Sequence, residues 1–134
     1  MDYQNLWYAL TQIAHNFGAV VVVAMPLHAI CRGIQRPAKP TLLVTLAGWL
    51  IQLSSGTLFG LISLFYYGQL PDIHGTAVAA LIIKLVCAGL SISLCLFMLR
   101  HARLNLPSTH LQWLSLSVLG AVALTAAAVL RWFS

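Results

Sequence analysis

Residues 76–99, TAVAALIIKLVCAGLSISLCLFML, decide the fold class of this chain. The stretch is almost entirely apolar, and it is as long as the roughly 20 residues that a helix needs to cross a bilayer. Because the hydrocarbon core holds no water, every backbone N–H must find its partner inside the segment, and a helix provides that partner. The stretch therefore predicts a membrane-spanning helix, interrupted by a single charged residue, Lys84.

Three further stretches of the same kind, residues 6–30, 41–67 and 111–133, complete the pattern. The connections between them are short, and each contains Pro, which favours helix ends. Of all residues 60% are apolar and 7% are charged, whereas soluble domains contain about 25% charged residues. The sequence thus predicts an all-α, polytopic integral membrane four-helix bundle. It forms a single transmembrane domain over residues 1–134, with the lipid bilayer as its first partner.

The net charge of +5 follows membrane topology and does not indicate nucleic-acid binding. Basic residues gather in the first connection, residues 31–40, and around the third, at Arg100 and Arg103, whereas the second, residues 68–75, has none. Loops rich in Lys and Arg stay on the cytoplasmic side. Both termini are therefore predicted to face outward, which is the periplasm if the protein lies in a bacterial inner membrane. Aromatic residues at the outer ends of the spans agree: Trp7, Tyr8, Tyr66, Tyr67 and Trp132.

Small and polar residues recur at helical spacing along the spans. In membranes such residues usually face other helices, because small ones allow close approach and polar ones find partners. The second span has the stripe Thr45, Gly48, Gln52, Ser55, Phe59 and Ser63, and the third has Ala77, Ala80, Lys84, Ala88, Ser91 and Cys95. The fourth has Ser117, Gly120, Ala123 and Ala127. Gly56-x-x-x-Gly60 is a further candidate contact.

Lys84 is the residue most indicative of function, since a charge inside a membrane is costly and often functional. The chain has two acids, Asp2 and Asp72, and neither lies inside a span. Two interpretations stay open. Helical side chains lean toward the N-terminus, so Lys84 can reach outward to lipid headgroups or Asp72. Alternatively, its ammonium pairs with an anion from elsewhere, such as a haem propionate, a substrate carboxylate or a partner's acid.

His15 lies at a similar depth in the first span, on one face with Thr11, Gly18 and Val22. A neutral imidazole there can bond another helix. It can also serve as an axial haem ligand or a proton carrier. Gly18, one turn away, would let a flat ring or a helix approach. His74, at the outer end of the third span, is a further candidate for this site.

A second set of candidate ligands lies at the inner end of the first span. Met25, His28 and Cys31 are soft ligands of the type that copper prefers, although their spacing spreads them over a broad arc of a helix. His15 and His28 are about 20 Å apart along a helix, so they cannot hold the same metal. His28 is instead a candidate partner of His101 or His110 at the inner surface.

Three features resemble the CopD/HemJ-like group of small bacterial membrane proteins, which includes the copper-resistance D domain and the HemJ-type protoporphyrinogen oxidases. The first is His15 in IAHNFGAV, and the second is the Gly-containing patch SSGTLFG in the middle of the second span. The third is HGTAVAALIIKL, in which a surface His precedes Lys84, with Arg100 closing the span. The resemblance implies that His15 and Lys84 take part in haem binding and activity.

Three functions follow as hypotheses. The leading one is membrane redox chemistry with haem b or a related ligand, in which His15 binds the iron, Lys84 and His74 lie nearby, and a quinone or porphyrinogen is the substrate. The second is a non-catalytic accessory subunit of a larger respiratory or photosynthetic complex, since the short connections leave little aqueous surface. The third is copper transport through Met25, His28 and Cys31. Other membrane subunits, or further copies of the chain, are the expected protein partners.

Overall fold

A computed structural model of the protein describes residues 3–34, 39–68 and 74–133. It consists of four helices: α1 Tyr3–Cys31, α2 Lys39–Tyr67, α3 Thr76–Arg103 and α4 His110–Phe133. All four are long and apolar enough to cross a membrane. The predicted all-α, four-helix membrane fold is confirmed, and each helix contains the whole of its predicted span.

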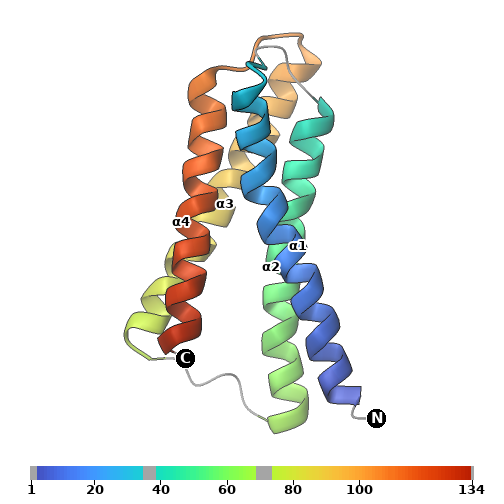
Figure 1. The fold of residues 1–134 in the computed structure, drawn as a ribbon, viewed down its shortest axis with the longest axis vertical. Coiled ribbons are helices and arrows are strands. Elements are labelled where there is room, and N and C mark those ends of the chain that lie inside the picture. The colour runs from blue at the N-terminus through green and yellow to red at the C-terminus, as the bar shows by residue number, and fades with distance from the viewer. Residues whose placement is uncertain (1–2, 35–38, 69–73, 134) are drawn as a thin grey trace.

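The helices run alternately up and down, so α1 begins and α4 ends at the same end of the bundle, called the terminal end below (Figure 1). Each helix packs on its two neighbours in a ring, with α1 most extensively on α2 and α3 on α4. α2 and α3 share the least contact, and they diverge toward the terminal end (Figure 1). The bundle is therefore two closely packed helix pairs, in which α1 and α3 lie on a diagonal.

Local sequence explains where α1 ends and where α4 begins. Beyond α1, Gly33 has a φ of 59°, and the N–H of Ile34 donates to the Ala29 carbonyl at 3.0 Å, as in a Schellman motif. At the start of α4, the N–H of Gln112 donates to Thr109 Oγ1 at 3.3 Å, and the N–H of Thr109 donates to Gln112 Oε1 at 2.9 Å. This capping box satisfies backbone groups that a helix leaves without internal partners.

The predicted stripes are the faces along which the helices pack. Lys84, Phe59 and Ser63 of these stripes are half-buried, and the other stripe residues of α2 and α3 are buried. Buried in α2 are Thr45, Gly48, Gln52 and Ser55, and buried in α3 are Ala77, Ala80, Ala88, Ser91 and Cys95. Large apolar side chains on the opposite faces are exposed and suit contact with lipid.

Two glycines let α1 approach its neighbours closely. A Cβ on Gly48 of α2 would lie 2.7 Å from Val21 Cγ1, and a Cβ on Gly120 of α4 would lie 3.1 Å from the Val22 carbonyl oxygen. In a regular helix the carbonyl of Val22 would accept a hydrogen bond from the N–H of residue 26. Residue 26 is Pro, which has no N–H, so that bond is missing. The Cα of Gly120 therefore packs where the helix ladder of α1 is interrupted.

The motif Gly56-x-x-x-Gly60 predicted a helix contact, and at Gly56 this prediction is wrong within the chain. A Cβ on Gly56 would meet no atom within 4 Å. Gly56 follows Ser55 by one residue, which turns it about 100° around the helix and away from the packed stripe.

We expect both termini to face outward. The connection from α2 to α3, at the terminal end, has no Lys or Arg, whereas Arg32 directly follows α1 and Arg103 ends α3 at the other end of the bundle. Arg36, Asp2 and Asp72 lie outside the described residues. Alkaline phosphatase fused to the C-terminus should be active, because it works only on the outer side of the membrane. Green fluorescent protein fused there should be dark, because it fluoresces only on the inner side. A fluorescent fusion with green fluorescent protein, together with an inactive phosphatase fusion, would show that the C-terminus faces inward.

Candidate functional site

His15 and Lys84 meet although their helices lie on a diagonal of the bundle. Lys84 Nζ lies 3.0 Å from His15 Nε2. Lys84 is about 12 Å along α3 from Thr76, so the pair lies within the membrane-spanning part of the bundle. Because α1 and α3 are not neighbours in the ring, the flexible four-carbon stem of Lys84 supplies the reach.

The second ring nitrogen of His15 is held by α2. His15 Nδ1 lies 2.7 Å from Ser55 Oγ, and that hydroxyl donates to the Ile51 carbonyl oxygen at 2.5 Å. A hydroxyl has one proton, so Ser55 accepts from His15 Nδ1–H. His15 Nε2 then bears the lone pair and accepts an N–H from Lys84. The bonding pattern thus assigns a neutral imidazole, protonated at Nδ1, beside the ammonium group.

Two more residues of the α2 stripe fix the position of His15. Gln52 Nε2 donates to the backbone carbonyl of His15. The rings of His15 and Phe59 meet edge to face, with centroids 5.8 Å apart and an interplanar angle of 71°. Tyr8 stacks on Phe59 with a centroid distance of 6.2 Å. Helical spacing placed Gln52, Ser55 and Phe59 on one face, but it gave no indication that His15 is the residue they contact.

The charge of Lys84 has no acid to balance it in the described part of the chain. Asp2 and Asp72, the two acids of the protein, both lie outside the described residues, so the predicted contact with Asp72 is outside them as well. An ammonium has three N–H donors, and His15 accepts one of them. The remaining donors favour an anionic or electron-rich oxygen from a ligand, a lipid or a partner.

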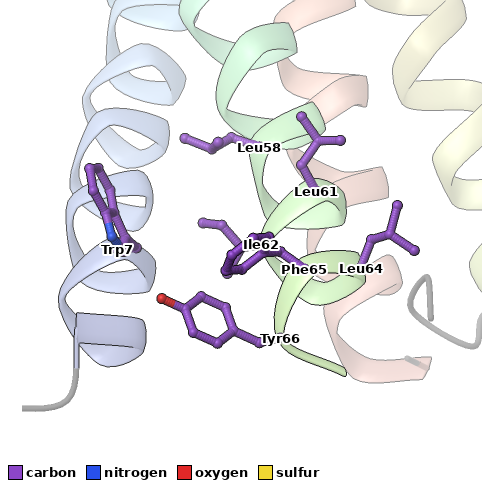
Figure 2. A pocket seen from close by; sticks show the side chains of 7 residues that line it. All are labelled: Trp7, Leu58, Leu61, Ile62, Leu64, Phe65 and Tyr66. Atoms are coloured by element: carbon purple, nitrogen blue, oxygen red, sulfur yellow. The ribbon is translucent and has the colours of Figure 1, made fainter. Parts of the chain in front are cut away.

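An apolar groove lies between α1 and α2 toward the terminal end, and neither His15 nor Lys84 lines it. It measures about 720 Å³, and Trp7 of α1 forms one side of it (Figure 2). Its other lining residues all come from α2: Leu58, Leu61, Ile62, Leu64, Phe65 and Tyr66. A second hollow of about 280 Å³ shares Trp7 and Leu58 with the groove and is lined also by Ser55. The two adjoining hollows thus extend from the terminal end as far as Ser55, the residue that holds His15.

The packing around His15 does not fit a haem as it stands. Both ring nitrogens are bonded, so iron could bind Nε2 only after Lys84 moved away. Gly18 was expected to let a flat ring or another helix approach, and in the structure the helix α2 approaches it. A Cβ there would lie 3.0 Å from Ile51 Cγ2 and 3.1 Å from Gln52 Nε2, so α2 already fills that side.

Haem binding at His15 stays a prediction, which the visible spectrum of the purified protein tests. If haem is bound, we expect a Soret band that is lost or shifted in His15→Ala, because the axial ligand is removed. His74→Ala should change the band less. A colourless wild-type protein, or equal haem content in His15→Ala, would contradict this ligand assignment.

The other predicted metal ligands lie at or near the ends of the helices. In the part of the chain that the structure describes, no group of three or more His, Cys, Asp and Glu residues could hold a metal. His74 is exposed just before α3, and His101 Nδ1 lies 3.0 Å from the Phe97 carbonyl oxygen. Met25 is half-buried, and His28 and Cys31 are exposed. Copper binding by Met25, His28 and Cys31 therefore stays a prediction from sequence.

Comparisons of the chain with protein-family models, with curated proteins and with solved structures find no match. The resemblance to the CopD/HemJ-like group rests on the sequence features quoted above and stays a prediction.

Proposed function

We propose that the protein binds a lipid-soluble redox substrate of the quinone or porphyrinogen type at the Lys84–His15 pair, in a bacterial inner membrane. The observation that supports this proposal is the 3.0 Å contact between Lys84 Nζ and His15 Nε2, in spans that contain no acid. A charged residue retained inside a membrane is a functional site by default, because its burial is costly.

The two side chains suit complementary tasks. Lys84 has N–H donors beyond the one that His15 accepts, and these favour a carboxylate, as in a porphyrinogen, or a quinone oxygen that gains negative charge on reduction. His15 Nε2 carries a lone pair that can accept a proton from a substrate once the N–H of Lys84 has turned to that substrate. The pair can therefore hold the polar head of the substrate and exchange a proton with it.

The groove of Figure 2 supports entry from the lipid. It is lined by apolar and aromatic side chains of α1 and α2, and the adjoining hollow reaches Ser55, which holds His15. Ligand sites of this kind are mostly apolar with a few polar groups that fix orientation. An apolar tail in the groove would leave the head near the hydrogen-bonded residues.

Titration of the purified protein in lipid nanodiscs tests the proposal. The probes are a short-chain benzoquinone and, separately, a dicarboxylic porphyrin, and the readout is quenching of tryptophan fluorescence. We expect saturable quenching by at least one probe, with most of the signal lost in Trp7→Phe because Trp7 lines the groove. Quenching that rises linearly with both probes, as for simple partitioning into lipid, would refute it.

A second function, as an accessory subunit of a larger membrane complex, is supported by the same unbalanced charge. Here an acid in a span of another subunit would pair with Lys84. A second copy of this chain cannot supply it, because Asp2 and Asp72 lie outside its spans. Purification in a mild detergent separates the two functions: larger subunits should co-purify with the wild type and be lost from Lys84→Met, whereas an isolated protein that binds the probes supports the first.

A further inference from the structure

Two polar atoms in the interior of the bundle have no hydrogen-bond partner among the described residues, Trp49 Nε1 and Ser91 Oγ. Trp49 is 1% exposed and Ser91 is 0% exposed. Buried polar atoms in folded proteins are nearly always bonded, and leaving one without a partner is unfavourable. The other fully buried indole follows this rule, since Trp113 Nε1 donates to Ser108 Oγ at 3.1 Å.

Ser91 also differs from other serines in the helices. A helical serine can donate to the carbonyl four residues before it, and Ser93, Ser115 and Ser117 do so at 2.8, 2.8 and 3.1 Å. Ser91 makes no such bond. Its hydroxyl therefore forgoes the nearest acceptor while it is fully enclosed, which indicates that something else in the interior bonds it.

The two residues lie on helices that pack against each other. Trp49 of α2 packs in one cluster with Cys87 and Ala88 of α3. Ser91 lies one turn beyond Ala88 on the same buried face of α3. α2 and α3 also share less direct contact than any other neighbouring pair of helices. A buried indole donor and a buried hydroxyl thus lie on two helices with little direct contact, and Ala88 of the Trp49 cluster is one turn from Ser91.

We propose that a buried water molecule bridges Trp49 and Ser91 and joins α2 to α3. An indole N–H only donates, whereas water both accepts and donates, so one molecule can accept from Trp49 Nε1 and bond Ser91 Oγ. Buried waters commonly satisfy interior polar groups in this way. The occupant is water and not a cation, because the indole N–H offers no lone pair to a metal. This inference is independent of the proposed substrate.

The melting temperature of Ser91→Ala shows whether Ser91 Oγ has no partner or is bonded to a bridging water, because the two cases change it in opposite directions. If Ser91 Oγ truly has no partner, its removal takes away an unfavourable buried atom, and the melting temperature should rise. If water bridges the two residues, the variant loses a bond, and the melting temperature should fall by a few degrees. In that case Trp49→Phe should cost less in the Ser91→Ala background than in the wild type, since both changes remove one shared bridge. Ser93→Ala, at an exposed serine on the same helix, is the matched control.

Radiolytic labelling in ¹⁸O-enriched water detects the bridging molecule directly in the wild-type protein. Trp49 and Trp113 are each 1% exposed, so bulk solvent reaches them equally poorly. A bound water next to Trp49 should label it several-fold faster than Trp113, and Ser91→Ala should reduce that difference. The proposal is overturned if Trp49 is labelled no faster than Trp113 in the wild type, or if Ser91→Ala raises the melting temperature.

Discussion

Lys84→Met is expected to insert and fold at least as well as the wild type while binding the quinone or porphyrin probe at least about tenfold more weakly. A Lys at the centre of a span opposes membrane insertion by roughly 2.5–3.5 kcal/mol and one off the centre, like Lys84, opposes it less; Met removes that opposition with a side chain of similar length. Tenfold weaker binding corresponds to about 1.4 kcal/mol. A hydrogen bond to a charged group is worth about as much or more, so its loss should produce at least this effect.

The structure adds a second consequence of this substitution. In the wild type, Lys84 donates to His15 Nε2, while Ser55 and Gln52 hold the rest of the histidine from α2. Lys84→Met therefore leaves the ring in place but without a partner on Nε2. Binding of the probe should therefore weaken without a change in the position of His15. The NMR signals of isotope-labelled histidine rings can check that position.

Two variants serve as controls for Lys84→Met. Lys84→Arg keeps the charge and should retain part of the binding, although a planar guanidinium does not replace an ammonium fully. Lys39→Met removes a lysine at the start of α2, far from the site, and should bind like the wild type. If Lys84→Met keeps both the probe and any co-purifying subunit, neither proposed function of Lys84 survives, and outward contact with lipid headgroups explains the residue.

Gly48→Leu is expected to have the largest effect on stability, lowering the free energy of unfolding by about 3 kcal/mol. Even a Cβ at this position would lie 2.7 Å from Val21 Cγ1 and 3.1 Å from Val22 Cγ1, and the rest of Leu would extend further into α1. β-branched valines have few alternative rotamers, so the two helices must separate. Unfolding of the purified protein in mixed micelles, followed by circular dichroism, measures the loss.

Gly56→Leu and Gly89→Leu are the matched controls, because a Cβ at either position meets no atom within 4 Å. Both should change stability by less than about 0.5 kcal/mol, as is usual for surface substitutions. Equal destabilisation at Gly48 and Gly56 would mean that the close packing of α1 on α2 is not what stabilises the bundle.

Much of the site was within reach of sequence reasoning, but its connections were not. The cost of a charge in lipid identified Lys84, and helical spacing placed Ser55 and Gln52 on a packing face. Neither argument says which residues of different helices meet. The stripe predicted a contact at Gly48 and the Gly-x-x-x-Gly motif predicted one at Gly56, yet of these two only Gly48 faces α1. Trp49 gave no signal at all, because an indole in an apolar span resembles any other large side chain until its neighbours are known.

The sequence alone determined that the chain forms four membrane-spanning helices and which face of α2 and α3 is buried. These properties depend on the solvent and on residues one turn apart, so they are local. Tertiary structure alone decided that Lys84 turns to His15 across the diagonal, and that Ser55 takes the other ring nitrogen. That choice depends on how far the helix pairs diverge and where α1 can approach closely at Gly48 and Gly120. Such distances are set by side-chain volumes on different helices, and no periodicity within one span contains them.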